Sequence, residues 1–130
     1  MSGRGMRSAL GRVRHHGASG EGTGHFIGQR VSAIALMFLA TWFVLSVALS
    51  MTEPSYRAAI DFITTPLNAV GVILLIVVSL YHMRLGMQAV VEDYIHKPVA
   101  KIVLLLLNTL IPIALGAGAI FAVLLVNFGA

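Results

Sequence analysis

The chain has 130 residues, of which 58% are hydrophobic and only 11% are charged, and its mean hydropathy is +0.90. Soluble domains carry about a quarter charged residues, and a chain this short could not hide so much apolar surface from water. The composition therefore predicts a membrane protein. Because the sequence contains no cysteine, disulfide scaffolds and thiolate zinc sites are excluded. Four of the nine basic residues lie in the first fourteen positions, so the net charge of +4 reflects a basic tail and not a nucleic-acid-binding surface.

Residues 1–24 are rich in glycine, serine and arginine and show no hydrophobic periodicity. Such a segment cannot bury enough apolar surface to fold alone, so we expect a basic flexible tail ahead of an anchor domain over residues 25–130. A secretory signal peptide is excluded, because residues 17–28 are polar and glycine-rich where its apolar stretch would have to lie. A mitochondrial transit peptide is the alternative for this segment, since no acidic residue precedes Glu21.

Three apolar stretches are long enough to cross a hydrocarbon core of ~30 Å at ~1.5 Å per residue. They cover residues 31–51, 66–91 and 102–128. The second opens with Pro66, which is suited to the first position of a helix because its missing N–H costs nothing there. The third contains Pro112, which bilayer helices tolerate when neighbours compensate for the lost hydrogen bond. The sequence predicts an all-α integral membrane protein with three transmembrane helices.

The basic residues are divided unevenly among the segments outside these spans. Eight of the nine lie before the first span or border the second loop, and only Arg57 lies in the first loop. The positive-inside rule then places the N-terminus and the second loop in the cytoplasm, and residues 52–65 and the C-terminus on the opposite side. We expect a multi-pass protein of a bacterial inner membrane, with the mitochondrial inner membrane as the alternative.

The second span contains ionisable side chains that lipid disfavours, which makes each of them a candidate site. His82 and Arg84 lie within it, and Asp93 and Tyr94 lie at its cytoplasmic end. Eleven residues rotate a helix by ~1100°, so His82 and Asp93 point in nearly the same direction about 16 Å apart. Gly86 follows one turn after His82 and leaves room for a flat ligand or another helix.

His82 is a candidate axial ligand of haem iron, because imidazole is the commonest protein ligand of that metal. The alternative is a histidine that hydrogen-bonds a serine or threonine hydroxyl on a neighbouring helix, and such a contact would count against the haem interpretation. No second histidine lies within a span, so a partner subunit would have to bring the other ligand. Arg30 and His25 could neutralise haem propionates, or they could be headgroup anchors.

Asp93 and Tyr94 lie where the second span meets the cytoplasmic headgroups. Binding and protonating a quinone carbonyl requires a donor such as a phenol beside a carboxyl group, since two-electron reduction must be matched by two protons. The alternative is an interfacial aromatic-belt tyrosine beside a solvated acid.

The segment from His82 to Tyr94 reads HMRLGMQAVVEDY and resembles the H-x-x-x-G-x-x-x-V-x-x-D-Y signature of the hydrophobic anchor subunit (SdhD type) of succinate dehydrogenase, respiratory complex II. Residues 22–33, GTGHFIGQRVSA, resemble the segment that opens the first helix of this subunit in alphaproteobacteria. The likeness covers roughly residues 22–128.

This resemblance implies specific roles for individual residues. His82 takes the position of an axial ligand to haem b, whose other ligand comes from the companion anchor subunit (SdhC type, cytochrome b556). Tyr94 takes the position of the tyrosine that hydrogen-bonds ubiquinone, and Asp93 that of its neighbouring acid. Arg30 matches an arginine near the haem propionates, and His25 is a weaker match because the enterobacterial histidine lies one residue further away. An aromatic residue replaces Arg84 in the enterobacterial members.

The resemblance also implies that the chain is not catalytic alone but is an anchor subunit of an oxidoreductase. Electrons from succinate would pass through FAD in a flavoprotein subunit and iron–sulfur clusters in a second soluble subunit to ubiquinone, linking the tricarboxylic acid cycle to the respiratory chain. The second anchor subunit would pack against this one in the membrane. The alternatives are an anchor of a fumarate reductase and, from another class, a structural or transporter subunit without redox function.

Overall fold

A computed structural model describes residues 21–129 of the chain, and residues 1–20 of the predicted tail over residues 1–24 lie outside the described part. The described part contains four helices: α2 (Glu21–Ser50), α3 (Tyr56–Thr64), α4 (Pro66–Tyr94) and α5 (Pro98–Phe128). Three of them, α2, α4 and α5, are long and apolar enough to cross a membrane, which confirms the three predicted spans. The division at residue 24 stays a prediction, although residues 21–24 form the first turn of α2 and not part of an irregular tail.

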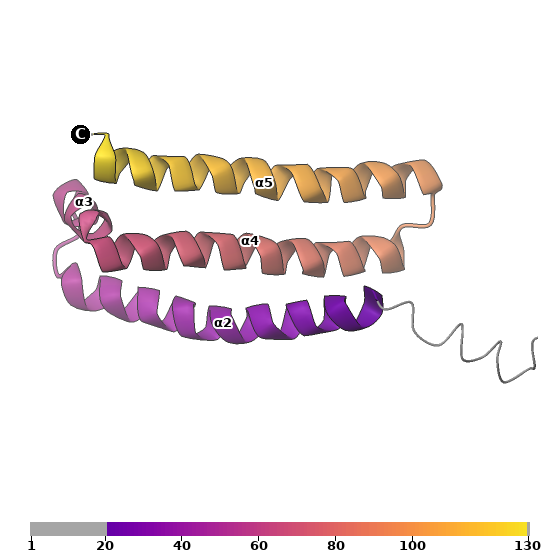
Figure 1. Ribbon diagram of the computed structural model, residues 1–130, viewed down its shortest axis with the longest axis horizontal. Helices are drawn as coiled ribbons and strands as arrows, with labels where there is room; N and C mark the ends of the chain where they lie inside the picture. The colour runs from indigo at the N-terminus through magenta and orange to yellow at the C-terminus, as the bar shows by residue number, and fades with distance from the viewer. Residues whose placement is uncertain (1–20, 130) are drawn as a thin grey trace, which may run out of the picture.

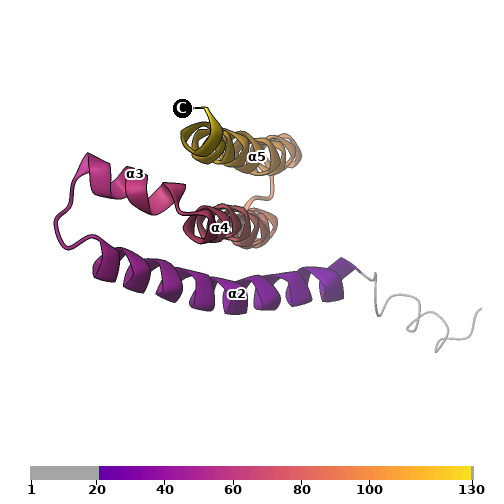
Figure 2. The same ribbon diagram turned by 60° about the vertical axis from the view of Figure 1, so that its left-hand side comes forward.

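The three long helices form a row in which α4 lies between α2 and α5 (Figure 1). In the described part of the chain α4 packs against both neighbours, and α2 does not contact α5. The view along α4 and α5 shows the same order, with α3 reaching across the end of the row (Figure 2). A row buries less surface than a closed bundle, so few side chains are fully enclosed and most large apolar side chains face outward.

Local sequence explains where α4 and α5 begin and end. Pro66 and Pro98 occupy the first turn of their helices, where a missing N–H breaks no hydrogen bond. The turn between the two helices is short, and the backbone N–H of Ile95 closes α4 by donating to the Val91 carbonyl at 3.0 Å. The third membrane helix therefore starts at Pro98, four residues before the predicted position.

Close packing of α2 on α4 depends on glycines that leave room for large rings. A Cβ atom at Gly71 would collide with the indole ring of Trp42. A Cβ atom at Gly28 would lie 2.6 Å from the Tyr81 hydroxyl. These two contacts fix the register of α2 against α4 and thereby determine which of their polar side chains meet.

Helix α3 occupies the loop that the sequence analysis leaves without structure. Its nine residues begin after Ser55, whose side-chain oxygen accepts a hydrogen bond from the Ala58 N–H at 3.1 Å. Phe62 is buried, and its ring meets that of Phe43 edge-on at 6.1 Å between centroids. The Asn127 amide of α5 donates to the Ile63 carbonyl at 3.0 Å, so α3 is fastened across the far end of the row.

Candidate functional site

A row of polar side chains lies on the side of α2 that faces α4. His25, Gln29 and Ser32 are spaced by four and three residues, which places them on one side of the helix. The amide nitrogen of Gln29 lies 3.6 Å from the position that a Cβ atom of Gly86 would take. The interface between the two helices is therefore polar at the end where the basic residues gather.

His82 of α4 meets Ser32 of α2 in the middle of this interface. Its Nδ1 atom lies 2.9 Å from the Ser32 hydroxyl oxygen. Ser32 is only 4% exposed, and its hydroxyl also contacts the Gln29 carbonyl oxygen of its own helix at 3.1 Å. This hydroxyl contact is the one that the alternative interpretation of His82 expects.

The contact engages one of the two ring nitrogens of His82. Among the described residues none hydrogen-bonds Nε2, and this atom reaches the surface of the chain. The imidazole is half-buried and keeps one nitrogen available to a group outside the chain. The interhelical hydrogen bond and an axial-ligand role therefore use different atoms, and the role itself stays a prediction.

His25 and Gln29 each contribute a buried atom that lacks a hydrogen-bond partner among the described residues. These atoms are Nε2 of His25 and Oε1 of Gln29. Leaving a buried polar group unpaired costs about 1–3 kcal/mol, so such groups normally have a partner. Seven residues separate His25 from Ser32, which aligns the two along α2 about 10 Å apart.

Arg30 lies on another side of α2. A separation of two residues rotates the helix by ~200°, so Arg30 points away from Ser32 and from the His82 contact. Its guanidinium stacks 5.1 Å from the centre of the Phe26 ring, and both side chains are exposed. The structure does not bring Arg30 to His82 within this chain, and its role near a propionate stays a prediction.

Asp93 and Tyr94 are the last two residues of α4 and both are exposed. Tyr94 is 76% exposed, and no described residue hydrogen-bonds either side chain. Because one continuous helix carries His82 and Asp93, their spacing places both side chains on one side of α4. The phenol and the carboxyl group are free to contact another molecule at this end of the protein.

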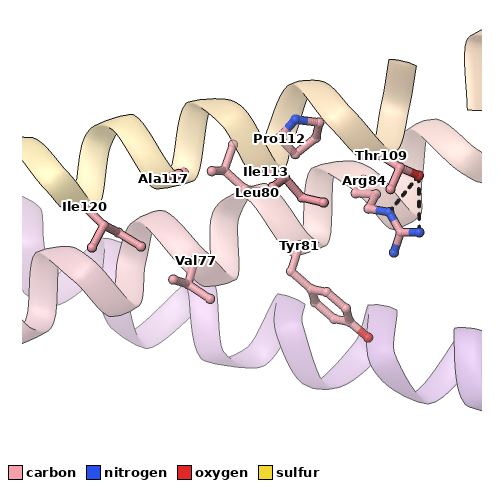
Figure 3. A pocket seen from close by; sticks show the side chains of 10 residues that line it. Val77, Leu80, Tyr81, Arg84, Thr109, Pro112, Ile113, Ala117 and Ile120 are labelled. Carbon is pink, nitrogen blue, oxygen red and sulfur yellow. Dashed lines mark hydrogen bonds between the residues drawn. The ribbon is translucent and has the colours of Figure 1, made fainter. Parts of the chain in front are cut away.

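Arg84 lies on the other side of α4 and points toward α5. Its Nε and Nη2 atoms each lie 3.4 Å from the Thr109 hydroxyl (Figure 3). The Arg84 carbonyl accepts a hydrogen bond from the Asn108 amide at 2.9 Å. An open cavity of about 480 Å³ adjoins the guanidinium and is lined otherwise by mostly apolar side chains of α4 and α5. Arg84 therefore belongs to the α4–α5 contact and not to the His82 side of the helix.

Sequence reasoning missed Ser32, Gln29 and Thr109. Ser32 carried a weak signal, because it is a polar residue seven positions after His25 within an apolar span. Thr109 carried none, because many membrane helices contain a threonine that bonds only its own backbone. Their partners lie in other helices, so only the packed structure identifies them.

The match to a protein-family model extends over residues 3–126, and the family is described as the succinate dehydrogenase/fumarate reductase transmembrane subunit. The chain is 31% identical over 90 residues to the succinate dehydrogenase hydrophobic membrane anchor subunit of Rickettsia bellii, covering 69% of this chain and 71% of that protein. It is 30% identical over 90 residues to the subunit of the same name from Rickettsia conorii, with the same coverage. No solved structure matches the chain.

The helices and the relatives agree on the setting of the protein. Three long apolar helices and a transmembrane family with bacterial members make it a multi-pass protein of a bacterial inner membrane. The chain belongs to the family of succinate dehydrogenase/fumarate reductase transmembrane subunits, and within that family it is similar to the hydrophobic membrane anchor subunits of succinate dehydrogenase.

Proposed function

We propose that this membrane anchor helps to bind haem b and forms part of the ubiquinone-reduction site of a succinate dehydrogenase. The observation that carries the proposal is the Nε2 atom of His82, which is accessible and unpaired within the described chain. The Ser32 contact, which by itself counts against a ligand role, uses Nδ1 and leaves Nε2 open. An imidazole that is oriented through one nitrogen and open at the other is the arrangement that metal-binding histidines use. The residues present therefore fit an axial haem ligand.

In this proposal Nε2 of His82 would hold the haem iron together with a ligand from the companion anchor subunit. Bound haem supplies reversible one-electron redox chemistry beside the quinone site. Arg30 and His25 lie in the first ten residues of α2 and are the candidates for contacts to the propionates.

At the end of α4 the Tyr94 hydroxyl donates a hydrogen bond to a carbonyl oxygen of ubiquinone. Asp93 beside it would pass protons toward the same oxygen, because reduction of a quinone to a quinol adds two electrons and two protons. Both side chains are exposed and unpaired in the described chain, which leaves them free for this contact. The electrons come from succinate through FAD and iron–sulfur clusters that the flavoprotein and iron–sulfur subunits carry.

The test replaces His82 with alanine in the assembled membrane complex and records the reduced-minus-oxidised spectrum. We expect the haem signal to disappear while the four subunits still purify together. His96→Ala is the matched control, because His96 is an exposed histidine between α4 and α5 and should leave the spectrum unchanged. A His82→Ala complex with an unaltered low-spin haem spectrum would rule out the ligand role.

The family name covers fumarate reductase as well, which makes an anchor of that enzyme the nearest alternative. The relatives named above are all succinate dehydrogenase subunits, and this favours the dehydrogenase. A structural or transporter subunit without redox chemistry also accommodates the hydrogen bond between Ser32 and His82. The reduced-minus-oxidised spectrum distinguishes this alternative from the proposed function. A structural or transporter subunit would give a colourless complex that contains no flavoprotein.

A further inference from the structure

We propose that Ser32 is a positioning residue that fixes the tautomer and the orientation of the His82 imidazole for its axial bond. This inference rests on the proposed function, because it assigns a role to Ser32 only if Nε2 of His82 binds iron. Its physical basis is the hydrogen-bond geometry between α2 and α4.

Both contacts of the Ser32 hydroxyl are satisfied at once when Nδ1 of His82 carries the ring proton. The Gln29 carbonyl oxygen can only accept, and in this arrangement it takes the Ser32 hydroxyl proton at 3.1 Å. The Ser32 oxygen then accepts from Nδ1 of His82 at 2.9 Å. A neutral imidazole with its proton on Nδ1 carries its lone pair on Nε2. The tautomer that satisfies both contacts is therefore the one that can bind a metal.

The contact also restrains how the ring is turned. Ser32 is 4% exposed and lies inside a continuous helix, with its hydroxyl tied to the preceding turn. A hydroxyl held in this way offers its lone pair in a fixed direction, and the ring of His82 must present Nδ1 to it. Nε2, on the opposite edge of the ring, is thereby aimed away from α2.

Other hydroxyl groups of the same helix do not share this arrangement. Thr41 donates to the Met37 carbonyl, and Ser50 donates to the Ser46 carbonyl, and in the described chain neither hydroxyl bonds another side chain. Such backbone contacts are common for serine and threonine within helices and carry no further role. Within α2, Ser32 is the hydroxyl that bridges to another helix.

A hydrogen bond from Nδ1 to an acceptor raises the basicity of the iron-binding nitrogen. A more basic ligand favours ferric over ferrous iron, so loss of the acceptor should raise the midpoint potential of the haem. Outer contacts of this kind typically change metal affinity by about 10–100-fold. A neutral hydroxyl is a weaker acceptor than a carboxylate, and we expect about a tenfold loss in haem retention.

The experiment compares Ser32→Ala, Ser32→Thr and Thr41→Ala in the purified four-subunit complex. We expect Ser32→Ala to raise the haem midpoint potential, to alter its low-spin electron paramagnetic resonance signal and to increase haem loss about tenfold. Ser32→Thr retains a hydroxyl and should restore all three properties toward the wild type. Thr41→Ala is the control and should change none of them.

A Ser32→Ala complex that keeps its haem with the wild-type potential and resonance signal would overturn the inference. If Ser32→Ala does not assemble, Ser32→Cys takes its place. A thiol is a weaker acceptor than a hydroxyl, so a midpoint potential above that of the wild type supports the inference and an unchanged potential overturns it. His82→Ala separates the two proposals. Loss of haem in His82→Ala together with an unaltered Ser32→Ala complex would leave the proposed function standing and remove only the role of Ser32.

Discussion

Tyr94 is 76% exposed at the last residue of α4, which makes it the side chain best placed to contact a quinone without moving the fold. Tyr94→Phe removes one hydroxyl and keeps the ring, so the substitution isolates a single hydrogen bond. Losing that bond should cost about 1–3 kcal/mol at the quinone and slow quinone reduction accordingly. Succinate oxidation with a soluble dye should stay nearly unchanged, because the dye does not use this site.

The control for this prediction is Tyr56→Phe. Tyr56 is also strongly exposed, at 82%, but it opens α3 at the opposite end of the helix row. Its substitution should leave both rates unchanged. Equal rates of quinone and dye reduction in the wild-type and Tyr94→Phe complexes would contradict a role for the Tyr94 hydroxyl.

The spacing of His82, Gly86 and Asp93 could be predicted because all three lie in one helix, whose geometry is fixed by residue number alone. Ser32 could not, because it lies fifty residues before His82 and only packing brings them together. The direction of Arg84 was open for the same reason, since a bilayer arginine can extend toward the surface or bond a neighbour. Residue numbers alone give the relative positions of side chains within one helix. Contacts between helices can be predicted only when the register of α2 and α5 against α4 is known.

At the scale of the elements, the ends of the helices differ most from the sequence-based expectation. The predicted first span starts at residue 31 because Arg30 is the last charged residue before the apolar stretch, and the glycines at residues 22, 24 and 28 lower intrinsic helix stability ahead of it by about 1 kcal/mol each relative to alanine. Packing against α4 outweighs this cost, and α2 begins ten residues earlier, at Glu21. Helix α3 was missed because a stretch of nine residues is too short to be stable alone and takes its stability from burial of Phe62.

The short length of α3 makes its capping residue important. Ser55→Ala removes the side-chain oxygen that accepts from the Ala58 N–H, and the expected cost is about 0.5–2 kcal/mol. Hydrogen exchange should become faster in the amides of residues 56–58 while the amides of α4 keep their protection. Ser55→Asp retains an oxygen acceptor and serves as the control. Unchanged exchange in Ser55→Ala would show that packing alone holds the first turn of α3.

At the contact between α4 and α5, the charged Arg84 side chain lies against the hydroxyl of Thr109. Valine has nearly the same shape as threonine and lacks this hydroxyl. Thr109→Val deletes the hydroxyl that lies 3.4 Å from two nitrogens of Arg84. Because these hydrogen bonds are long, the expected loss in the free energy of unfolding in detergent is at the lower end of the usual range, about 1 kcal/mol. Thr41→Val is the matched control: its hydroxyl bonds only its own helix, and the loss should be smaller than about 0.5 kcal/mol. Equal losses in the two variants would mean that Thr109 does not support Arg84.

At the scale of the whole molecule, α2 and α5 cover two opposite sides of α4, and the row leaves its other two sides incompletely covered. Buried hydrophobic residues are few in the described chain: Phe62, Ala69, Leu85, Val91 and Val123. Most large apolar side chains of the described chain are exposed, so lipid or a second protein can cover them. This surface is consistent with the proposed second anchor subunit.

The orientation of the three helices in the membrane decides whether Tyr94 can contact the soluble subunits. Because the chain contains no cysteine, this orientation can be measured with single introduced cysteines. Thr52→Cys and His96→Cys introduce single exposed thiols at opposite ends of the helix row. The positive-inside rule places His96, with the basic residues around it, in the cytoplasm. A membrane-impermeant thiol reagent should therefore label Thr52→Cys in intact spheroplasts and His96→Cys only after the membrane is broken.

Both variants should react equally after denaturation, which controls for intrinsic reactivity. Labelling in the reverse order would place Tyr94 on the side away from the cytoplasm, and the proposed delivery of electrons from cytoplasmic subunits to a quinone at this end of α4 would then be impossible.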